Sequence, residues 1–193
     1  MKKINKIIRN KVFLSDGEVL DVNFDIKNKY GLKEDMCIES LYDEISYEAS
    51  LAKALYLLSL RDRTEEELRV KLNEKVKNKK ANEKVILRIK ELGYIDDYEY
   101  ALLYAKNSKY GEKRIEFELL KRGISKSQIK EIFLNINEDS DDKLKKSMKK
   151  VIHKEEKKII QYLIRQGFEL EDILLELKNN REEEWELYYT ALQ

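Results

Sequence analysis

Nine arginine and lysine side chains are spaced so that they could bind an anionic partner. They are Arg61, Arg63, Arg69, Lys71, Lys113, Arg114, Lys121, Arg122 and Arg165. Cations that recur along one face could contact an acidic protein surface or the phosphates of DNA, and such binding would weaken steeply with salt. The alternative is a solvated helix face, on which cations pair with nearby glutamates, for example Lys71 with Glu67. The sequence leaves both interpretations open.

Six tyrosines accompany these cations: Tyr56, Tyr94, Tyr98, Tyr100, Tyr104 and Tyr110. Their rings could stack on the bases of a single-stranded nucleic acid. The helical spacing of Tyr100 and Tyr104 fits packing between helices better. Packing is therefore the interpretation that we favour.

Residues suited to catalysis or metal binding are scarce. The sequence has no phosphate-cradling glycine loop, no nucleophile elbow and no cysteine–histidine pair. His153, the one histidine, stands among lysines without a matching ligand. Asp96 and Asp97 follow a helix-ending glycine, Gly93, and are placed to cap a helix rather than to hold a metal. We expect no enzyme, no cofactor and no metal site.

An internal repeat must position the candidate side chains. Three apolar pairs share one phase, and they are Leu68 with Leu72, Ile115 with Leu119, and Ile159 with Leu163. The pairs start 47 and 44 residues apart, and Gly123 and Gly167 follow the last two pairs. A period of this length predicts tandem helical units, each burying its apolar face against its neighbours. The basic candidates then lie around the middle helix of each unit.

The residue pattern divides the chain into four segments. We predict a β-hairpin extension over 1–48 and three-helix repeats over 49–95, 96–138 and 143–193, the last with a C-terminal tail. Thr64 with Glu67, Asp96 with Asp97, and Ser125 mark helix starts within the repeats. Residues 137–142 form an acidic linker.

The extension contains short β-compatible runs over Ile4–Ile8 and Lys11–Leu14. Ser15–Glu18 contains Asp-Gly, which favours a tight turn. Val19–Phe24 is then predicted to be the return strand, with Val22 and Phe24 on one face. A small antiparallel unit of this size should pack on the helices that follow.

Composition supports a helical, soluble protein. The 193 residues include no proline and six glycines, which favours continuous helices. The single cysteine, Cys37, excludes an intramolecular disulfide, and no apolar run is long enough to span a membrane. We expect a cytoplasmic monomer. The net charge is only +1, although segments 71–90 and 143–158 each carry +6.

Several stretches resemble the RecX family, which regulates the RecA recombinase. They are ALYLLSLRDRTEEELRVKL over 54–72, LGYIDD over 92–97, Tyr100-Ala101, GEKRI over 111–115 and ELLKRGI over 118–124. The resemblance spans roughly residues 50–178 and covers all three repeats. The N-terminal hairpin resembles an extension that some members carry.

The resemblance implies a mainly α fold, an elongated crescent of tandem three-helix repeats preceded by a small N-terminal β-hairpin unit. It implies a regulator, usually an inhibitor, of the RecA nucleoprotein filament. Members lie along the filament groove and modulate ATPase, strand exchange and filament growth in homologous recombination, DNA repair and the SOS response. Several also bind single- or double-stranded DNA.

The sequence departs from the family pattern in three ways. Val76 replaces the expected glycine of the first repeat, Tyr110-Gly111 replaces more basic residues, and the net charge is near neutral. The last departure argues for weak DNA binding. Two other functions stay open. One is an independent DNA-binding protein, in which helix-turn-helix-like repeats and the run Lys75–Lys84 contact phosphates. The other is a solenoid scaffold for an unrelated protein.

Overall fold

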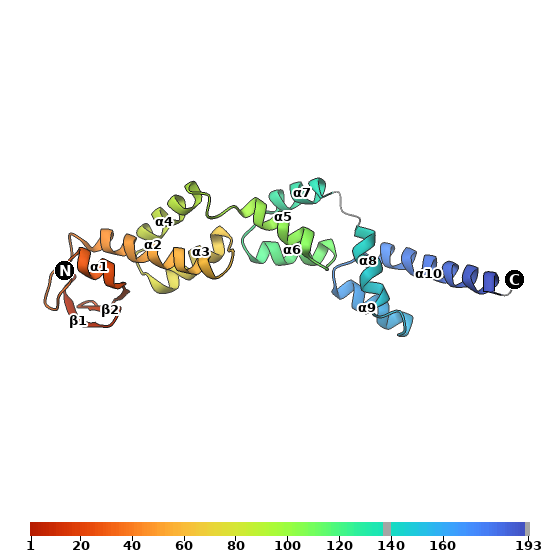
Figure 1. The fold of residues 1–193 in the computed structure, drawn as a ribbon, viewed down its shortest axis with the longest axis horizontal. Coiled ribbons are helices and arrows are strands. Elements are labelled where there is room, and N and C mark those ends of the chain that lie inside the picture. The colour runs from red at the N-terminus through yellow and green to blue at the C-terminus, as the bar shows by residue number, and fades with distance from the viewer. Residues whose placement is uncertain (137–139, 192–193) are drawn as a thin grey trace. The chain divides into compact units, whose positions relative to one another are not determined.

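A computed structural model describes residues 1–136 and 140–191, and the side chains of residues 1–136 and 142–182. The described residues form three strands and ten helices (Figure 1). The chain divides into two compact units, Met1–Tyr100 and Ala101–Gln193. The four-segment division is finer and stays a prediction. Residues 137–139 of the predicted linker lie outside the described residues, and the chain is helical from Ser140.

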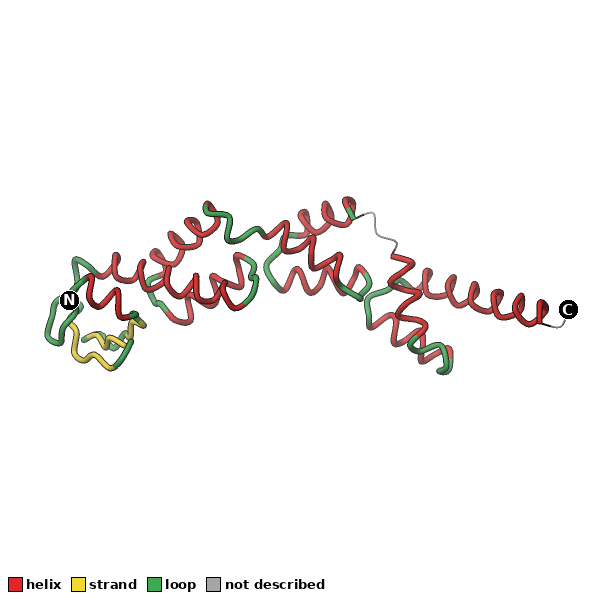
Figure 2. The backbone as a smooth tube through the Cα atoms, viewed as in Figure 1, coloured by secondary structure: helices red, strands yellow, loops and turns green. Residues whose placement is uncertain are grey.

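The N-terminal strands form one antiparallel sheet in the order β1-β2-β3 (Figure 2). Their bounds are Ile4–Ile8 for β1, Lys11–Leu14 for β2 and Val19–Asp21 for β3. The turn before β3 contains Gly17 at a positive φ of 82°. The inner face of the sheet buries Ile4, Val12, Leu14 and Leu20 against Ile45 and Ala49. A three-stranded unit thus gains the apolar contacts that it lacks by itself.

The predicted return strand over Val19–Phe24 is too long. It ends at Asp21, and α1 (Phe24–Lys29) begins three residues later. The Asn23 side chain accepts a hydrogen bond of 2.9 Å from the Ile26 amide and caps this helix. Asparagine favours such local side-chain bonds over a strand ladder. Phe24 consequently lies 68% exposed, while Val22 is buried as expected.

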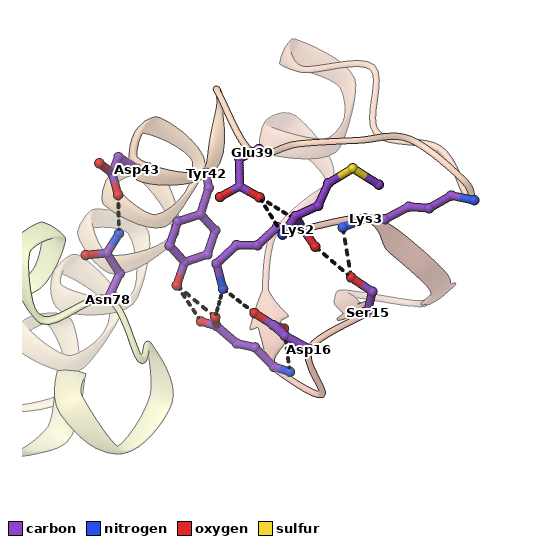
Figure 3. Close-up of polar contacts among 10 residues, drawn as sticks. Lys2, Lys3, Ser15, Asp16, Glu39, Tyr42, Asp43 and Asn78 are labelled. Carbon is purple, nitrogen blue, oxygen red and sulfur yellow. Dashed lines mark hydrogen bonds and ion pairs between the residues drawn. The ribbon is translucent and has the colours of Figure 1, made fainter.

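A polar cluster attaches the sheet to α2 (Tyr42–Leu60), as Figure 3 shows. Lys2 Nζ donates to Asp16 at 2.6 Å and to Glu18 at 2.8 Å, and it lies 4.0 Å from the centre of the Tyr42 ring. The Tyr42 hydroxyl donates to the buried Glu18 carboxylate. Burial, together with this carboxylate, raises the pKa of Tyr42 to about 12. The buried charge is therefore fully partnered.

Two further helices complete the first repeat, α3 (Glu65–Lys75) and α4 (Lys79–Glu91). Thr64 caps α3 as predicted, because its hydroxyl accepts from the Glu67 amide at 3.2 Å. The helix α4 begins at Lys79. Asn78 caps it, and the fully buried Asn82 accepts from Ser50 and donates to Asn73 and to the Val76 carbonyl. Residues of α2, of α3 and of the connection after α3 thus supply the hydrogen bonds of the buried Asn82 amide.

The remaining helices are α5 (Asp97–Asn107), α6 (Glu112–Lys121), α7 (Lys126–Asn135), α8 (Ser140–Lys149), α9 (Glu156–Arg165) and α10 (Leu170–Ala191). Ser125 and Gln128 form a capping box at the start of α7. The last three helices bury one apolar cluster, composed of Leu144, Met148, Val151, Ile159, Leu163, Phe168, Ile173 and Leu177.

The six residues of the repeated apolar pairs are all buried, at 3% exposure or less. Gly123 and Gly167 follow α6 and α9 in left-handed backbone conformations, with φ of 87° and 91°. The helix α3 ends differently. Val76 is buried and extended, at φ −121° and ψ 117°. It begins a three-residue connection, 76–78, whereas four residues follow both α6 and α9 before the next helix. The predicted mainly α repeat fold with a small N-terminal sheet is confirmed.

The single cysteine, Cys37, is exposed. Of the helices in the part of the chain that the structure describes, none is long and apolar enough to cross a bilayer.

Candidate partner-binding surface

Three of the four basic candidates in the first unit pair with carboxylates. Arg61 lies 3.1 Å from Glu67, and Lys71 lies 2.9 Å from Glu74 rather than beside Glu67. Both pairs are about half exposed on the cation side, so they contribute little stability. Such weak pairs can open when a more strongly charged partner approaches.

Arg69 is the exception, because three carboxylates surround its guanidinium. Glu65, Glu66 and Glu83 lie 2.6, 2.7 and 2.9 Å away. Glu83 foremost, followed by the other two carboxylates, raises the pKa of Arg69. Through Glu83 the side chain joins α3 to α4. We interpret Arg69 as a structural residue of the fold.

The second unit contains the other five candidates. Lys113 pairs with Glu169 at 2.6 Å, and Arg122 pairs with Glu118 at 3.0 Å while lying 4.7 Å from the centre of the Tyr104 ring. Lys121 is exposed. Two of the five cations are thus paired with carboxylates, whereas a basic stripe requires cations that are available to a partner. That these residues contact a partner stays a prediction.

Backbone carbonyls hold the remaining three arginines. Arg63 donates to the Leu57 carbonyl, and Arg165 donates to the Gln161 carbonyl of its own helix. Arg114 donates to the Arg165 carbonyl at 3.1 Å and lies 4.2 Å from the centre of the Tyr110 ring. The fold therefore brings two predicted residues, Arg114 and Arg165, into one contact between α6 and α9.

That contact continues through two glycines. The Gly111 amide donates to the Gln166 carbonyl at 2.9 Å, and the Lys113 amide donates to the Gly167 carbonyl at 3.3 Å. A Cβ at Gly111 would lie 2.3 Å from the Gly167 oxygen, and one at Gly167 would lie 2.5 Å from the Arg114 nitrogen. The first turn of α6 thus receives the carbonyls that end α9, and the opposed helix ends attract each other. We call this contact the glycine junction.

In the first unit, side chains rather than backbone carbonyls accept hydrogen bonds from the first amides of the helices. Asp96 caps α5, as predicted, by accepting from the Glu99 amide at 2.9 Å. Asp97 has a different role, because its carboxylate accepts from the Glu65 amide at 2.8 Å and caps α3. Burial raises the pKa of Asp97. We call this contact the aspartate cap.

The tyrosines divide into two groups. Tyr98, Tyr100, Tyr104 and Tyr110 are partly buried, as the packing interpretation predicts. Tyr56 and Tyr94 are 55% and 59% exposed. Only these two rings of the six offer most of a face to a base or to another protein.

Sequence reasoning missed a basic hollow of about 390 Å³ in the second unit, which we call the lysine hollow. Its lining is Lys106, Asn107, Ser108, Lys109, Asp142, Lys143, Lys146, Ser147 and Lys150. Lys143 and Lys146 share one face of α8, and Lys150 directly follows the end of that helix. The helical spacing of these three lysines could have indicated half of this site. The other half comes from the end of α5, which only the fold brings close.

A second hollow of similar volume, about 380 Å³, lies between α2 and α4 in the first unit. Asp43 and Glu44 face Lys80 and Lys84 there. The opposed charges balance, so this hollow has no excess of either sign. In the described part of the chain, no three His, Cys, Asp or Glu side chains gather as metal ligands.

The comparisons with known proteins agree on one family. A regulatory protein RecX of Clostridium acetobutylicum is 32% identical over 130 residues, which are 64% of this chain and 61% of that protein. A RecX of Caldanaerobacter subterraneus is 35% identical over 135 residues, or 65% of this chain and 68% of the relative. A Geobacillus RecX is 30% identical over 193 residues, which cover 91% of this chain and 71% of the relative. The chain belongs to the RecX family.

Solved RecX structures support the fold. A crystal structure of a regulatory protein RecX has a TM-score of 0.55 at 23% identity and covers 89% of this chain and 97% of the other. The RecX of Lactobacillus salivarius has a TM-score of 0.57 at 24% identity and covers 69% of this chain and 97% of its own. No family model matches the chain. The RecX relatives are regulatory proteins by name.

Proposed function

We propose that this chain is a cytoplasmic, non-enzymatic regulator of the RecA recombinase that inhibits the RecA–DNA filament. Its membership of the RecX family, through matches that include the helical repeats, carries the proposal. The protein acts as a monomer, lies along the filament groove and restrains ATP hydrolysis, strand exchange and filament growth. Homologous recombination and the SOS response are the processes that it would restrain.

The repeats suit this role because similar helical units recur along the sequence. A repeat protein can contact successive protomers of a filament, and each contact raises the effective concentration for the next. The loosely paired cations Arg61, Lys71 and Lys113 can exchange their carboxylate partners for acidic groups on RecA or for DNA phosphates. Arg69 serves as a control, since its three carboxylates belong to the fold.

The test is DNA-dependent ATP hydrolysis by RecA, with filament length followed in parallel, while this protein is titrated well below the RecA concentration. Inhibition at substoichiometric ratios supports action at filament ends or across many protomers. No effect at equimolar protein contradicts the proposal. The triple substitution Arg61→Gln, Lys71→Gln and Lys113→Gln should weaken inhibition. A double substitution at exposed lysines of α7, Lys126→Gln with Lys130→Gln, provides the matched charge control.

An independent DNA-binding protein is the second candidate function. Five lysines, at positions 75, 77, 79, 80 and 84, follow the end of α3 and the start of α4. None of the five forms an ion pair with a described carboxylate. Tight binding to bare duplex DNA with a steep salt dependence, combined with no effect on RecA, would favour this candidate.

A further inference from the structure

A further cavity, of about 140 Å³, lies in the second unit beside the glycine junction, and we call it the junction pocket. Gly111 and Gly167 line it. Its apolar side chains are those of Ala105, Ile115, Phe133, Ile136 and Phe168. Apolar cavities of about 150 Å³ bind a molecule the size of benzene. The junction pocket therefore has room for one six-membered ring.

Three helices and one connection supply this apolar lining. Ala105 belongs to α5, Ile115 to α6 and Phe133 to α7. Phe168 lies in the connection between α9 and α10. Ala105, Ile115 and Phe168 are buried, at 7% exposure or less. A ring in the pocket would thus leave water for an apolar surface to which segments far apart in the sequence contribute, and that burial favours binding.

The polar part of the lining is predominantly acidic. It consists of three carboxylates, Glu112, Glu169 and Asp172, and one lysine, Lys143. Lys113 pairs with Glu169 at 2.6 Å. Within the part of the chain that the structure describes, neither Glu112 nor Asp172 forms an ion pair. These two carboxylates are therefore available to a cation from outside the chain.

Lys143 opposes such a cation, but the end of α5 offsets part of its charge. Lys143 Nζ donates to the Ala105 carbonyl at 2.8 Å. The carboxyl end of a helix carries partial negative charge, which favours a lysine there. The described lining keeps an excess of carboxylates over cations, so the pocket favours a positive ligand over a negative one.

We propose that the junction pocket binds a small organic cation, in which an ammonium group is joined to one six-membered apolar ring. The ring fills the apolar part of the pocket, and the ammonium group pairs with Glu112 and Asp172. The site goes beyond RecA regulation, because it needs neither RecA nor DNA. A bound ligand would contact α5, α6, α7 and the connection before α10 at once, and so stabilise their packing.

The experiment is a titration of benzylammonium chloride into the isotope-labelled full chain, followed by two-dimensional amide spectra. The amide signals of Ile115 and Phe168 should shift with a dissociation constant of about 1 mM, as expected for so small a ligand. Benzyl alcohol, which has the same ring without the charge, should bind more weakly. Methylammonium, which has the charge without the ring, should cause no shift at these amides.

Substitutions locate the ligand. The rim variant, Glu112→Gln with Asp172→Asn, should bind benzylammonium about fivefold more weakly. The effect is modest because both carboxylates are exposed and lie in the first turns of α6 and α10, where partial positive charge opposes a cation. The control variant, Glu131→Gln with Glu171→Gln, removes two exposed carboxylates of α7 and α10 that do not line the pocket. Its affinity should equal that of the parent.

A third variant, Ala105→Leu, fills the pocket and should abolish the shifts, with circular dichroism to establish that it remains folded. If it unfolds, the rim variant still decides, since its two positions are exposed. Absence of shifts in the parent at about 20 mM benzylammonium, roughly twenty times the expected dissociation constant, overturns the inference. Equal affinity of parent and rim variant, or equal affinity for benzylammonium and benzyl alcohol, also overturns it. Because the titration contains no RecA, its outcome is independent of the proposed function.

Discussion

The aspartate cap and the glycine junction satisfy the same physical need by different means. The first amides of α3 and of α6 have no partner within their own helices. At α3 the Asp97 carboxylate, 32 residues further along the chain, accepts from the Glu65 amide. At α6 the carbonyls of Gln166 and Gly167 accept from the Gly111 and Lys113 amides.

The two solutions differ in what they demand of the sequence. A side-chain cap needs one acceptor of suitable length, so an isosteric amide can replace it. A backbone contact needs two segments to approach closely, so any Cβ in the gap collides with the opposite backbone. The aspartate cap therefore tolerates substitution by another acceptor, and its contribution to stability depends on pH. The glycine junction tolerates no side chain, and its contribution does not depend on pH. Substitutions can test each part of this contrast.

The largest effect is expected for Gly167→Ala. The substitution places a side chain at φ 91° and a Cβ 2.5 Å from the Arg114 nitrogen. The strain and the collision together should lower the free energy of unfolding by about 3 kcal/mol. Urea denaturation followed by circular dichroism measures the loss.

Gly93→Ala is the matched control for this substitution. Gly93 also has a positive φ, of 73°, but a Cβ added there would meet nothing within 4 Å. It should cost only the strain of the left-handed backbone, about 1 kcal/mol. Equal losses at the two glycines would mean that close approach contributes nothing at the glycine junction.

Gly111→Ala should have the next largest effect. Its φ of −72° suits any residue, so the cost comes only from the collision of the added Cβ with the Gly167 carbonyl and the Phe168 nitrogen. We expect a loss of about 2 kcal/mol and faster amide exchange at Lys113. Because both substitutions open one contact, the double variant with Gly167→Ala should lose less than the sum of the single losses. Fully additive losses would mean that Gly111 and Gly167 contribute to stability independently of each other.

At the aspartate cap, Asp97→Ala should cost about 1 kcal/mol, because the Glu65 amide loses its acceptor. Asp97→Asn keeps an oxygen in place and removes a partly buried charge, so its stability should stay close to that of the parent. Thermal unfolding of both variants measures the difference. If the asparagine variant loses as much as the alanine variant, the charge rather than the acceptor supports α3.

The smallest expected effect is a pH dependence that belongs to Asp97. Burial raises its pKa in the folded chain, so the folded state binds the proton more tightly than the unfolded state. The stability from this group therefore falls as pH rises from about 3.9, the ordinary aspartate value, through the raised pKa.

Glu65 acts in the opposite direction. Lys90 and Arg69 lower its pKa, so its contribution is lost as pH falls. Glu65 is present in both the Asp97→Asn variant and the parent, so its pH-dependent contribution cancels in the difference between their stabilities. The variant should gain stability relative to the parent as pH rises through this range, as followed by calorimetry. A constant difference at every pH would contradict the assignment, and Gly111→Ala should show such a constant difference.

Short-range signals in the sequence predicted the repeat and several helix starts. Thr64 and Ser125 cap their helices because capping joins residues three apart, a relation that the sequence displays directly. The repeated apolar pairs are buried for the same reason, since helical spacing alone places them on one face. The strand predicted to reach Phe24 failed because Asn23 can serve either a strand or a cap, and its contact with Ile26 decided between them.

The sequence by itself determined the helical repeat, the family and the local caps, because each apolar pair, each family motif and each cap is a short stretch of residues that the sequence displays directly. Only the tertiary structure decided the partner of Asp97, the need for glycine at Gly111, and the meeting of Lys106 with Lys146 in one hollow. Each of these joins residues at least 32 positions apart. At that separation, the packing of the helices decides which carboxylate, carbonyl or lysine lies next to a given residue. Helix periodicity in the sequence does not predict that packing.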